Sequence, residues 1–249
     1  MKIKLIIIFS IILIGVVFVF IEPIPQPQSY YKFSDNNNYF GINNFWNVIS
    51  NTPFLLVGLF GLILDKNKKL THDNYLITPV YSIFFLGIFL TSFGSSWFHL
   101  NPSNETLVWD RLPMTIGFMA LTTGLLSEYL KRELQQYLLY PLLLIGFTSV
   151  IYWHFTEQAG RGDLRLYALV QFLPLLVIPA VVVTHKPRYT CSWDLIWVFI
   201  FYILAKVTEH FDHAIHQLLG GVSGHSIKHL LAAAAAYMVL RMLQRRKPV

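Results

Sequence analysis

Eight long apolar runs dominate this sequence and limit what it can fold into. They lie near residues 5–21, 46–64, 76–98, 109–130, 137–153, 164–184, 193–211 and 225–243. Most approach the roughly 20 residues that a helix needs to cross about 30 Å of hydrocarbon. Only 13% of the residues are charged, against about 25% in soluble domains. The sequence therefore predicts an all-α, polytopic membrane protein.

The first run differs from the other seven. It follows the basic sequence MKIK and continues into FIEPIPQPQ without the small-residue site at which signal peptides are cleaved. An uncleaved anchor is therefore favoured over a signal peptide, and the Pro-rich stretch after it predicts an extended linker. We expect an N-terminal hydrophobic anchor and linker over residues 1–32, followed by a seven-transmembrane-helix domain over residues 33–249.

The distribution of lysine and arginine orients these helices. With the N-terminus in the cytoplasm, the inner loops and ends hold Lys2, Lys4, Lys66, Lys68, Lys69, Lys131, Arg132, Lys186, Arg188, Arg241, Arg245, Arg246 and Lys247. The outer loops and helix mouths hold only Lys32, Arg111, Arg161 and Arg165. This bias follows the positive-inside rule and predicts that both termini are cytoplasmic. The inner loops also account for the net charge of +6, so the basic balance indicates no nucleic-acid partner.

Following the chain through this topology brings five polar residues to the outer edge of the membrane. They are Ser95, His99, Asp110, His225 and His229. Ionisable groups are costly in hydrocarbon, so such a cluster predicts a functional site. Three imidazoles can hold a catalytic zinc with the fourth coordination position open for water. We expect a zinc site that faces the non-cytoplasmic side.

Each of these residues also has a simpler explanation when taken alone. His225 and His229 share one helical face, one turn apart, after the predicted N-cap Ser223. Ser95 lies one turn from His99 and could bond a carbonyl of its own helix. Asp110 opens its apolar run, where a carboxylate suits the positive end of the helix dipole. The joint occurrence of three imidazoles at one depth is what favours metal binding.

Two further groups remain open. Lys206 and Glu209 are three residues apart on a helix and are predicted to pair. Three histidines and an aspartate follow Glu209, and they are His210, Asp212, His213 and His216. A solvated loop is favoured for them over a role in hydrogen-bonding to the metal ligands.

A glycine-rich segment offers a different chemistry. Gly221-Val222-Ser223-Gly224 matches the G-x-S-G of rhomboid-type intramembrane serine proteases. A glycine-rich turn before a helix explains the same residues.

The ordered motifs resemble the alkaline ceramidase family, within the superfamily that includes the adiponectin-type receptors. That superfamily carries S-x-x-x-H, then Asp, then H-x-x-x-H on seven helices. Here these motifs read Ser95-Ser-Trp-Phe-His99, Asp110 in WDRLPM, and His225-Ser-Ile-Lys-His229, and FWNVISN at 45–51 is also similar. The resemblance spans about residues 33–243. It implies that the three histidines hold zinc and that the aspartate and serine serve the water and the reacting carbonyl.

One departure from the family concerns calcium. Eukaryotic alkaline ceramidases have an acid-rich N-terminal segment that binds this ion. The corresponding stretch here, SDNNNYFGINNFWN, has Asp35 as its one acid. Charge count tunes calcium affinity, so a calcium site is doubtful.

The resulting hypothesis is a zinc-dependent amide hydrolase that takes a lipid substrate from the bilayer. Asp110 and Ser95 are the predicted catalytic residues, and the resemblance favours a ceramide-like lipid. One alternative is a receptor-like or structural seven-helix protein with a non-catalytic zinc. The other is an intramembrane serine protease that uses Ser223. The sequence gives no indication of the oligomeric state.

Overall fold

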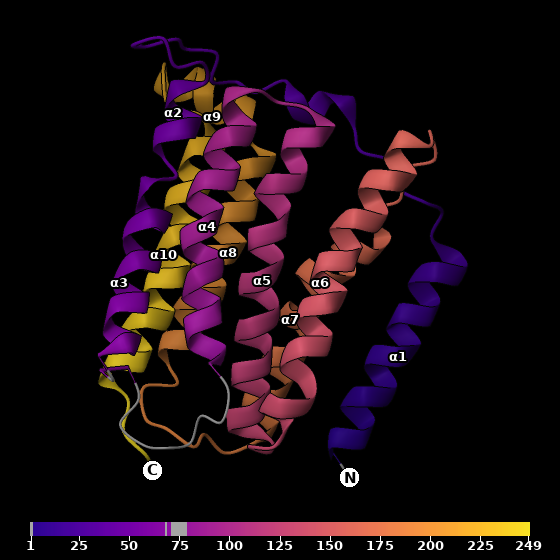
Figure 1. Ribbon diagram of the computed structural model, residues 1–249, viewed down its shortest axis with the longest axis vertical. Helices are drawn as coiled ribbons and strands as arrows, with labels where there is room; N and C mark the ends of the chain where they lie inside the picture. The colour runs from indigo at the N-terminus through magenta and orange to yellow at the C-terminus, as the bar shows by residue number, and fades with distance from the viewer. Residues whose placement is uncertain (1, 68, 71–78) are drawn as a thin grey trace. The chain divides into compact units, whose positions relative to one another are not determined.

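The structure, a computed structural model, describes residues 2–67, 69–70 and 79–249 (Figure 1). Its helices are α1 (Lys2–Phe20), the 3₁₀ helix η1 (Gln28–Tyr31), α2 (Phe45–Ile49), α3 (Thr52–Lys66), α4 (Val80–Leu100), α5 (Asn104–Tyr129), α6 (Leu134–Gln158), α7 (Arg165–Thr184), α8 (Asp194–His210), α9 (Asp212–Leu219) and α10 (Gly224–Arg245). Within the described ranges there are two isolated β-bridges and no strand. The predicted all-α class is confirmed.

Each predicted apolar run is mostly helical where it is described, and the second is interrupted at Ser50 and Asn51, between α2 and α3. Residues 76–78 of the third run lie outside the described residues. Among the described helices, five segments are long and apolar enough to cross a membrane, and they are Phe45–Lys66, α4, α6, α7 and α10. The described apolar part of α1, Ile8–Phe20, is shorter. These helices confirm a polytopic membrane protein.

The chain divides into two compact units. The first comprises Met1–Pro27, Tyr75–Phe84 and Thr115–Arg188, and the second comprises Gln28–Asn74, Phe85–Met114 and Tyr189–Val249. The division at residue 32 expected from the sequence stays a prediction.

The first unit contains α1, α6 and α7. The α1 helix contacts α7, and Arg165 at the start of α7 ties the two together. Its guanidinium donates to the carbonyl of Ile21 at 2.6 Å and pairs with Asp163 at 2.7 Å. The linker after α1 is also bound, because Leu164 donates its amide to the carbonyl of Ile24 at 2.8 Å.

The second unit is organised around α10, which packs along α8 and α3 (Figure 1). At its first residue, a Cβ on Gly224 would lie 2.2 Å from the carbonyl oxygen of Thr208. Only glycine permits this approach without a shift of the backbone. The start of α10 is therefore held directly against the end of α8.

Two local predictions were wrong. The fourth apolar run was expected to become helical near residue 109, but α5 begins at Asn104. It begins early because Ser103 and Thr106 cap the helix reciprocally. The Ser103 hydroxyl accepts from the Thr106 amide at 3.2 Å, and the Thr106 hydroxyl accepts from the Ser103 amide at 3.1 Å. Asp110 thus lies beyond the first turn, and an N-terminal carboxylate does not explain it.

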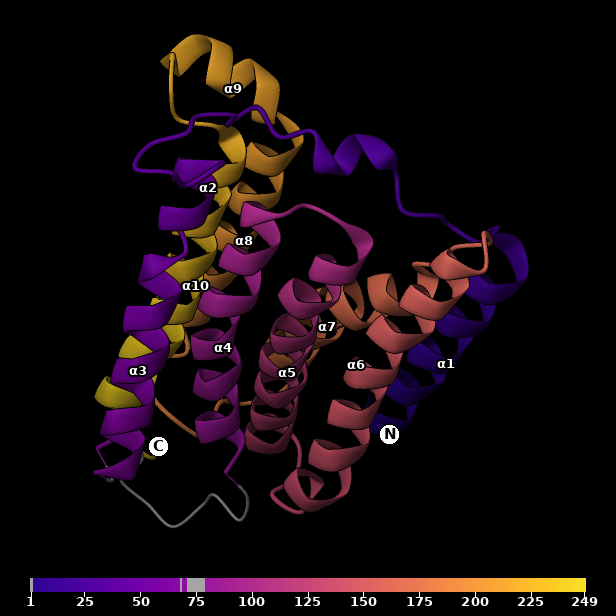
Figure 2. The same ribbon diagram turned by 45° about the horizontal axis from the view of Figure 1, so that its top comes forward.

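The second error concerns the predicted loop after α8. Residues 212–219 form the short helix α9, which ends at Gly220 with a φ of 68°. Figure 2 shows α9 between the ends of α8 and α10. A glycine in the left-handed conformation is a common helix stop, so this sequence supports one more helix before α10.

Candidate metal centre

Three histidines meet in the second unit. His99 lies in the last turn of α4, and His225 and His229 lie in the first two turns of α10. One ligand atom from each ring lies within 4.8 Å of the others, and all three side chains are buried. Among the described residues, no other group of three His, Cys, Asp or Glu side chains is arranged in this way. The predicted convergence of these residues is confirmed.

The donor set fits a metal ion. Within the described part of the chain, neither ring nitrogen of His99 has a hydrogen-bond partner, although the residue is 0% exposed. A buried polar atom without a partner is destabilising by about 1–3 kcal/mol, and a coordinated cation would remove that penalty. Tetrahedral Zn–N bonds of about 2.0–2.1 Å place two ligand nitrogens about 3.4 Å apart, so small side-chain shifts from the observed spacing, within 4.8 Å, would bring the three rings onto one ion.

His229 is oriented by residues of the α2–α3 segment. Its Nδ1 lies 2.8 Å from the Ser50 hydroxyl, which itself donates to the carbonyl oxygen of Asn47 at 3.1 Å. Because the Ser50 proton is used on Asn47, Nδ1 of His229 is the donor, which leaves the lone pair of Nε2 for a metal.

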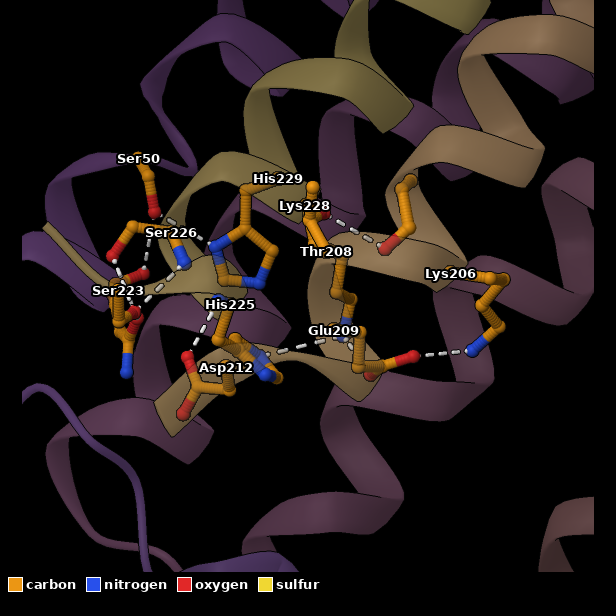
Figure 3. Close-up of polar contacts among 12 residues, drawn as sticks. Ser50, Lys206, Thr208, Glu209, Asp212, Ser223, His225, Ser226, Lys228 and His229 are labelled. Atoms are coloured by element: carbon orange, nitrogen blue, oxygen red, sulfur yellow. Dashed lines mark hydrogen bonds and ion pairs between the residues drawn. The ribbon is translucent and has the colours of Figure 1, made fainter. Parts of the chain in front are cut away.

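The first turn of α10 is fixed by the same segment. Ser223 is the N-cap and its hydroxyl accepts from the Ser226 amide at 3.0 Å, as predicted. The Ser223 and Ser226 hydroxyls both donate to Oδ1 of Asn47, at 3.0 and 2.7 Å (Figure 3). Since the Ser223 proton is donated to an amide oxygen, these contacts favour the capping role over that of a nucleophile.

Asp212 of α9 joins three segments around the histidines. One carboxylate oxygen accepts from the backbone amide of His225 at 2.7 Å, and the other accepts from that of Ser34 at 3.1 Å. His213 also approaches Ser34, with Nδ1 2.6 Å from its hydroxyl. These residues, which sequence reasoning placed in a solvated loop, hold the 28–35 segment against the start of α10.

That segment places aromatic rings on the histidines. The Phe33 ring centroid lies 4.6 Å from that of His99 and 5.2 Å from that of His225. Tyr30 stacks near Phe98 at 6.2 Å. Desolvation raises the pKa of the Tyr30 hydroxyl above its ordinary value, and the nearby Lys228 ammonium opposes that rise. The histidine cluster is therefore sheltered from water on this side.

Asp110 and Ser95 form a second polar pair in the same unit. Both side chains are buried, and the Ser95 hydroxyl lies close enough to the Asp110 carboxylate to act on its charge. The backbones that carry them are in direct contact, because a Cβ on Gly94 would lie 1.9 Å from the carbonyl oxygen of Trp109. Glycine at residue 94 thus permits the approach that joins the serine to the aspartate.

An ion-paired array lies beside His225. Glu209 accepts from Lys206 at 2.6 Å through one oxygen, which confirms the predicted pair, and from Lys228 at 2.7 Å through the other. The Lys228 ammonium is also 3.3 Å from Nε2 of His225 (Figure 3). Two cations share one anion here, so the array carries a net positive charge next to the metal ligands.

Asp35 is the acid of the stretch considered for calcium. One carboxylate oxygen accepts from the backbone amide and side chain of Asn37, at 3.3 and 2.9 Å, and the other accepts from the Asn47 amide at 2.8 Å. Both oxygens thus serve nitrogen donors and fix the start of α2. The doubtful calcium site stays a prediction.

A groove of about 270 Å³ lies on α3 and α4, with polar Asn51, Ser92 and Ser96 beside apolar Leu55, Phe93 and Trp97. None of the three histidines and neither Asp110 nor Ser95 lines it. The chemical groups are therefore gathered at the histidine cluster and not in this groove.

Sequence reasoning missed the outer partners of the histidines. Ser50 and Asn47 belong to FWNVISN, a stretch whose family resemblance was visible but whose polar side chains had no assigned role. Lys228 was only a helical lysine in the sequence. Its position between His225 and His229 was the signal, since a cation inside an H-x-x-K-H turn must lie near the ligands.

A comparison with protein-family models gives a match to the model described as Ceramidase over residues 35–247. The chain belongs to the ceramidase family. A comparison with curated proteins gives no match. Membership supports a ceramidase-type hydrolase in the membrane, and the suspected resemblance to alkaline ceramidases is confirmed. The histidine triad of this ceramidase-family chain is a group that could bind a metal.

Proposed function

We propose that this protein is a zinc-dependent hydrolase that cleaves the amide bond of a membrane lipid, with ceramide-like lipids as the favoured substrates. The observation that carries the proposal is the convergence of three buried, closely spaced imidazoles. His99, His225 and His229 are the proposed ligands. Bound zinc supplies a Lewis acid and lowers the pKa of water toward 7.

The remaining residues have separate roles in this proposal. Asp110 acts as general base and takes a proton from the water that attacks the amide carbonyl. The sequence-based hypothesis gave Ser95 a role at the carbonyl oxygen. Its position beside Asp110 supports a different role, in which it orients the carboxylate. Ser50 orients His229, and Phe33 limits the entry of bulk water, which strengthens electrostatic contacts inside the site.

The proposed substrate is a lipid because the histidines lie on α4 and α10, two helices long and apolar enough to cross a membrane, and because the chain belongs to the ceramidase family. An acyl chain can remain among apolar side chains while the amide reaches the histidine cluster. Ceramide is favoured by family membership, and the acyl chain length is left open.

We further propose that both termini are cytoplasmic and that the site lies toward the non-cytoplasmic face. The distribution of lysine and arginine supports this orientation. Reporter fusions after Lys69, after Arg132 and at the C-terminus are expected to report the cytoplasm. A C-terminal reporter on the opposite side would contradict the proposed orientation.

The function is tested with purified, zinc-loaded protein in detergent or lipid nanodiscs. A panel of N-acyl lipids that includes ceramides is supplied, and the released fatty acid is measured by mass spectrometry. Release is expected to stop after chelation and to return when zinc is added. If zinc-loaded protein cleaves no lipid amide across a broad panel, a receptor-like or structural protein with inert zinc replaces the hydrolase.

A further inference from the structure

The Lys228 ammonium occupies an unusual position for a charge inside an apolar helix. Its side chain is 14% exposed, it pairs with Glu209, and it points to Nε2 of His225 at 3.3 Å. Charged side chains in membrane helices are expensive and generally mark function. The proposed hydrolase mechanism has so far given this lysine no role.

The contact with His225 is incompatible with metal ligation by that ring. A neutral imidazole that binds a metal through one nitrogen carries its proton on the other. Neither nitrogen of His225 can then accept a hydrogen bond from Lys228, whichever of the two is the ligand. A proton of the ammonium therefore needs a new acceptor once the metal is bound.

The neighbouring carboxylates do not provide that acceptor. Each oxygen of Glu209 already accepts from a lysine, one from Lys228 and one from Lys206. Among the described residues, Glu209 is the carboxylate within 4.0 Å of the Lys228 nitrogen, and Asp110 forms no such ion pair with it. Asp110 is nevertheless close enough for its charge to act on Lys228. The acceptor is thus a group that enters beside Lys228 and His225.

The reacting carbonyl oxygen has no assigned donor from the protein. Ser95 has one hydroxyl proton, and the proposed mechanism uses that proton to orient the Asp110 carboxylate. The Lys228 ammonium, 3.3 Å from Nε2 of His225, is a charged donor in a suitable position, and charged donors make the stronger hydrogen bonds. Donors directed at a developing negative oxygen are among the largest contributors to catalysis.

We propose that Lys228 donates a hydrogen bond to the carbonyl oxygen of the scissile amide and stabilises the negative charge that forms there. This inference rests on the proposed amide hydrolysis. Water adds its oxygen to the carbonyl carbon, the C–N bond breaks, and the proton taken by Asp110 passes to the leaving amine. Lys228 keeps its proton throughout, and Glu209 holds the ammonium in place.

The test compares two lysines that share the same carboxylate. Lys228→Gln removes the donor next to His225, and Lys206→Gln removes an equal charge from the other oxygen of Glu209. We expect Lys228→Gln to lower kcat by about 10²–10³-fold with little change in KM, as for loss of an oxyanion donor. Lys206→Gln is expected to keep kcat within about tenfold of wild type, since Lys206 pairs with Glu209 and is not a proposed donor to the substrate. Both variants are expected to keep their zinc, because neither lysine is a ligand.

A binding measurement separates this role from a structural one. Equilibrium binding of a long-chain fatty acid, whose carboxylate resembles the developing anion, is compared with binding of the fatty alcohol of equal length. Lys228→Gln is expected to weaken binding of the fatty acid by at least about tenfold and to leave binding of the fatty alcohol unchanged, because only the carboxylate pairs with the lysine ammonium. Lys206→Gln is expected to change neither by as much.

Each outcome decides the proposal. Wild-type kcat in zinc-loaded Lys228→Gln, or equal losses in the two variants, overturns it. If Lys228→Gln does not fold, Lys228→Arg is used instead, because it keeps the cation and its pairing with Glu209. Wild-type kcat and a wild-type preference for the fatty acid in zinc-loaded Lys228→Arg support the cationic donor. Loss of that preference overturns the proposal. Absence of turnover in the wild type instead contradicts the proposed hydrolase activity. The preference for the fatty acid over the fatty alcohol then tests, without any turnover, whether Lys228 binds a negatively charged oxygen.

Discussion

The two units of this protein each contain buried charges, and the charges are arranged differently. In the first unit, Arg165 pairs with Asp163, donates to the carbonyl of Ile21, and lies over the Phe18 ring at 4.9 Å from its centroid. Tyr152 completes the group by donating to Asp163 at 2.9 Å. Each anion and carbonyl there has its donor, and the group links α1 to the loop before α7.

In the second unit, two lysines share Glu209, and one of them faces a histidine that is a proposed ligand. His99 in the same unit has two buried ring nitrogens without a partner among the described residues. A group whose hydrogen bonds are complete holds helices together. A group with excess charge and unused lone pairs indicates that a ligand completes it. We therefore infer that the group around Arg165 stabilises the fold and that the group around Lys228 and the histidines binds a ligand.

The largest expected effect is loss of the metal. The double variant His225→Ala/His229→Ala removes two of three proposed ligands, so bound zinc is expected to fall from about one per chain to nearly none. The control is His154→Ala, which removes a histidine of the first unit and is expected to keep the zinc. Metal analysis of the purified proteins measures both. Full zinc retention in the double variant would falsify the ligand assignment.

The next effect concerns the proposed general base. Asp110→Asn keeps the size and one acceptor of the side chain but removes its basicity, so hydrolysis is expected to fall by about 10²–10⁴-fold while zinc stays bound. Asp163→Asn is the matched change in the first unit and is expected to leave turnover per folded molecule unchanged. Initial rates at equal zinc content measure the difference. Wild-type turnover by zinc-loaded Asp110→Asn rules out the base.

A smaller effect is expected at Ser50. Ser50→Ala removes the acceptor that holds Nδ1 of His229, and losses of such partners typically weaken metal binding by about 10–100-fold. Ser149→Ala is the control, since the Ser149 hydroxyl donates only to a carbonyl of its own helix, that of Gly146, at 2.7 Å. Competition with a chelator measures zinc affinity, and Ser50→Thr is expected to restore most of it. Equal affinities in Ser50→Ala and the wild type exclude this positioning role.

The smallest effect belongs to the first unit. Arg165→Gln is expected to lower the thermal midpoint on the order of a few degrees without changing zinc content. Arg165 holds the pKa of Asp163 below its ordinary value by hydrogen bonding. A carboxyl group whose pKa is lower in the folded than in the unfolded protein stabilises the fold at pH values above its unfolded-state pKa. That stabilisation is lost as the pH falls through its folded-state pKa. The difference in thermal midpoint between Arg165→Gln and the wild type is thus expected at pH 7 and is expected to shrink below about pH 4. An equal difference at acid pH would contradict an origin in the Arg165–Asp163 pair.

Much of the fold was predictable because single apolar runs are long enough to specify helices. The histidine cluster was also predictable, since helical spacing places His225 and His229 on one face and membrane depth brings His99 to the same level. The start of α5 was not, because reciprocal capping by Ser103 and Thr106 extended the helix through polar residues that carry no apolar pattern.

The outer partners of the site were beyond the reach of local rules. The Ser50 hydroxyl meets His229 across 179 residues of sequence, and the Asn47 amide oxygen meets Ser223 across 176. Such contacts depend on how α2 and α10 pack, which no periodicity encodes. Their residues are ordinary serines and asparagines that elsewhere serve as caps and turns, so composition alone did not single them out.

The contact between Gly94 and Trp109 has a consequence for how this site can change over time. These residues immediately precede Ser95 and Asp110, so the spacing of the serine and the aspartate is set by main-chain contact and not by the bulk of nearby side chains. Apolar residues that face the lipid can then be exchanged for others of similar hydrophobicity when the lipid composition of the membrane changes. The reactive pair keeps its geometry through such exchanges, while one added methyl group at residue 94 would separate it.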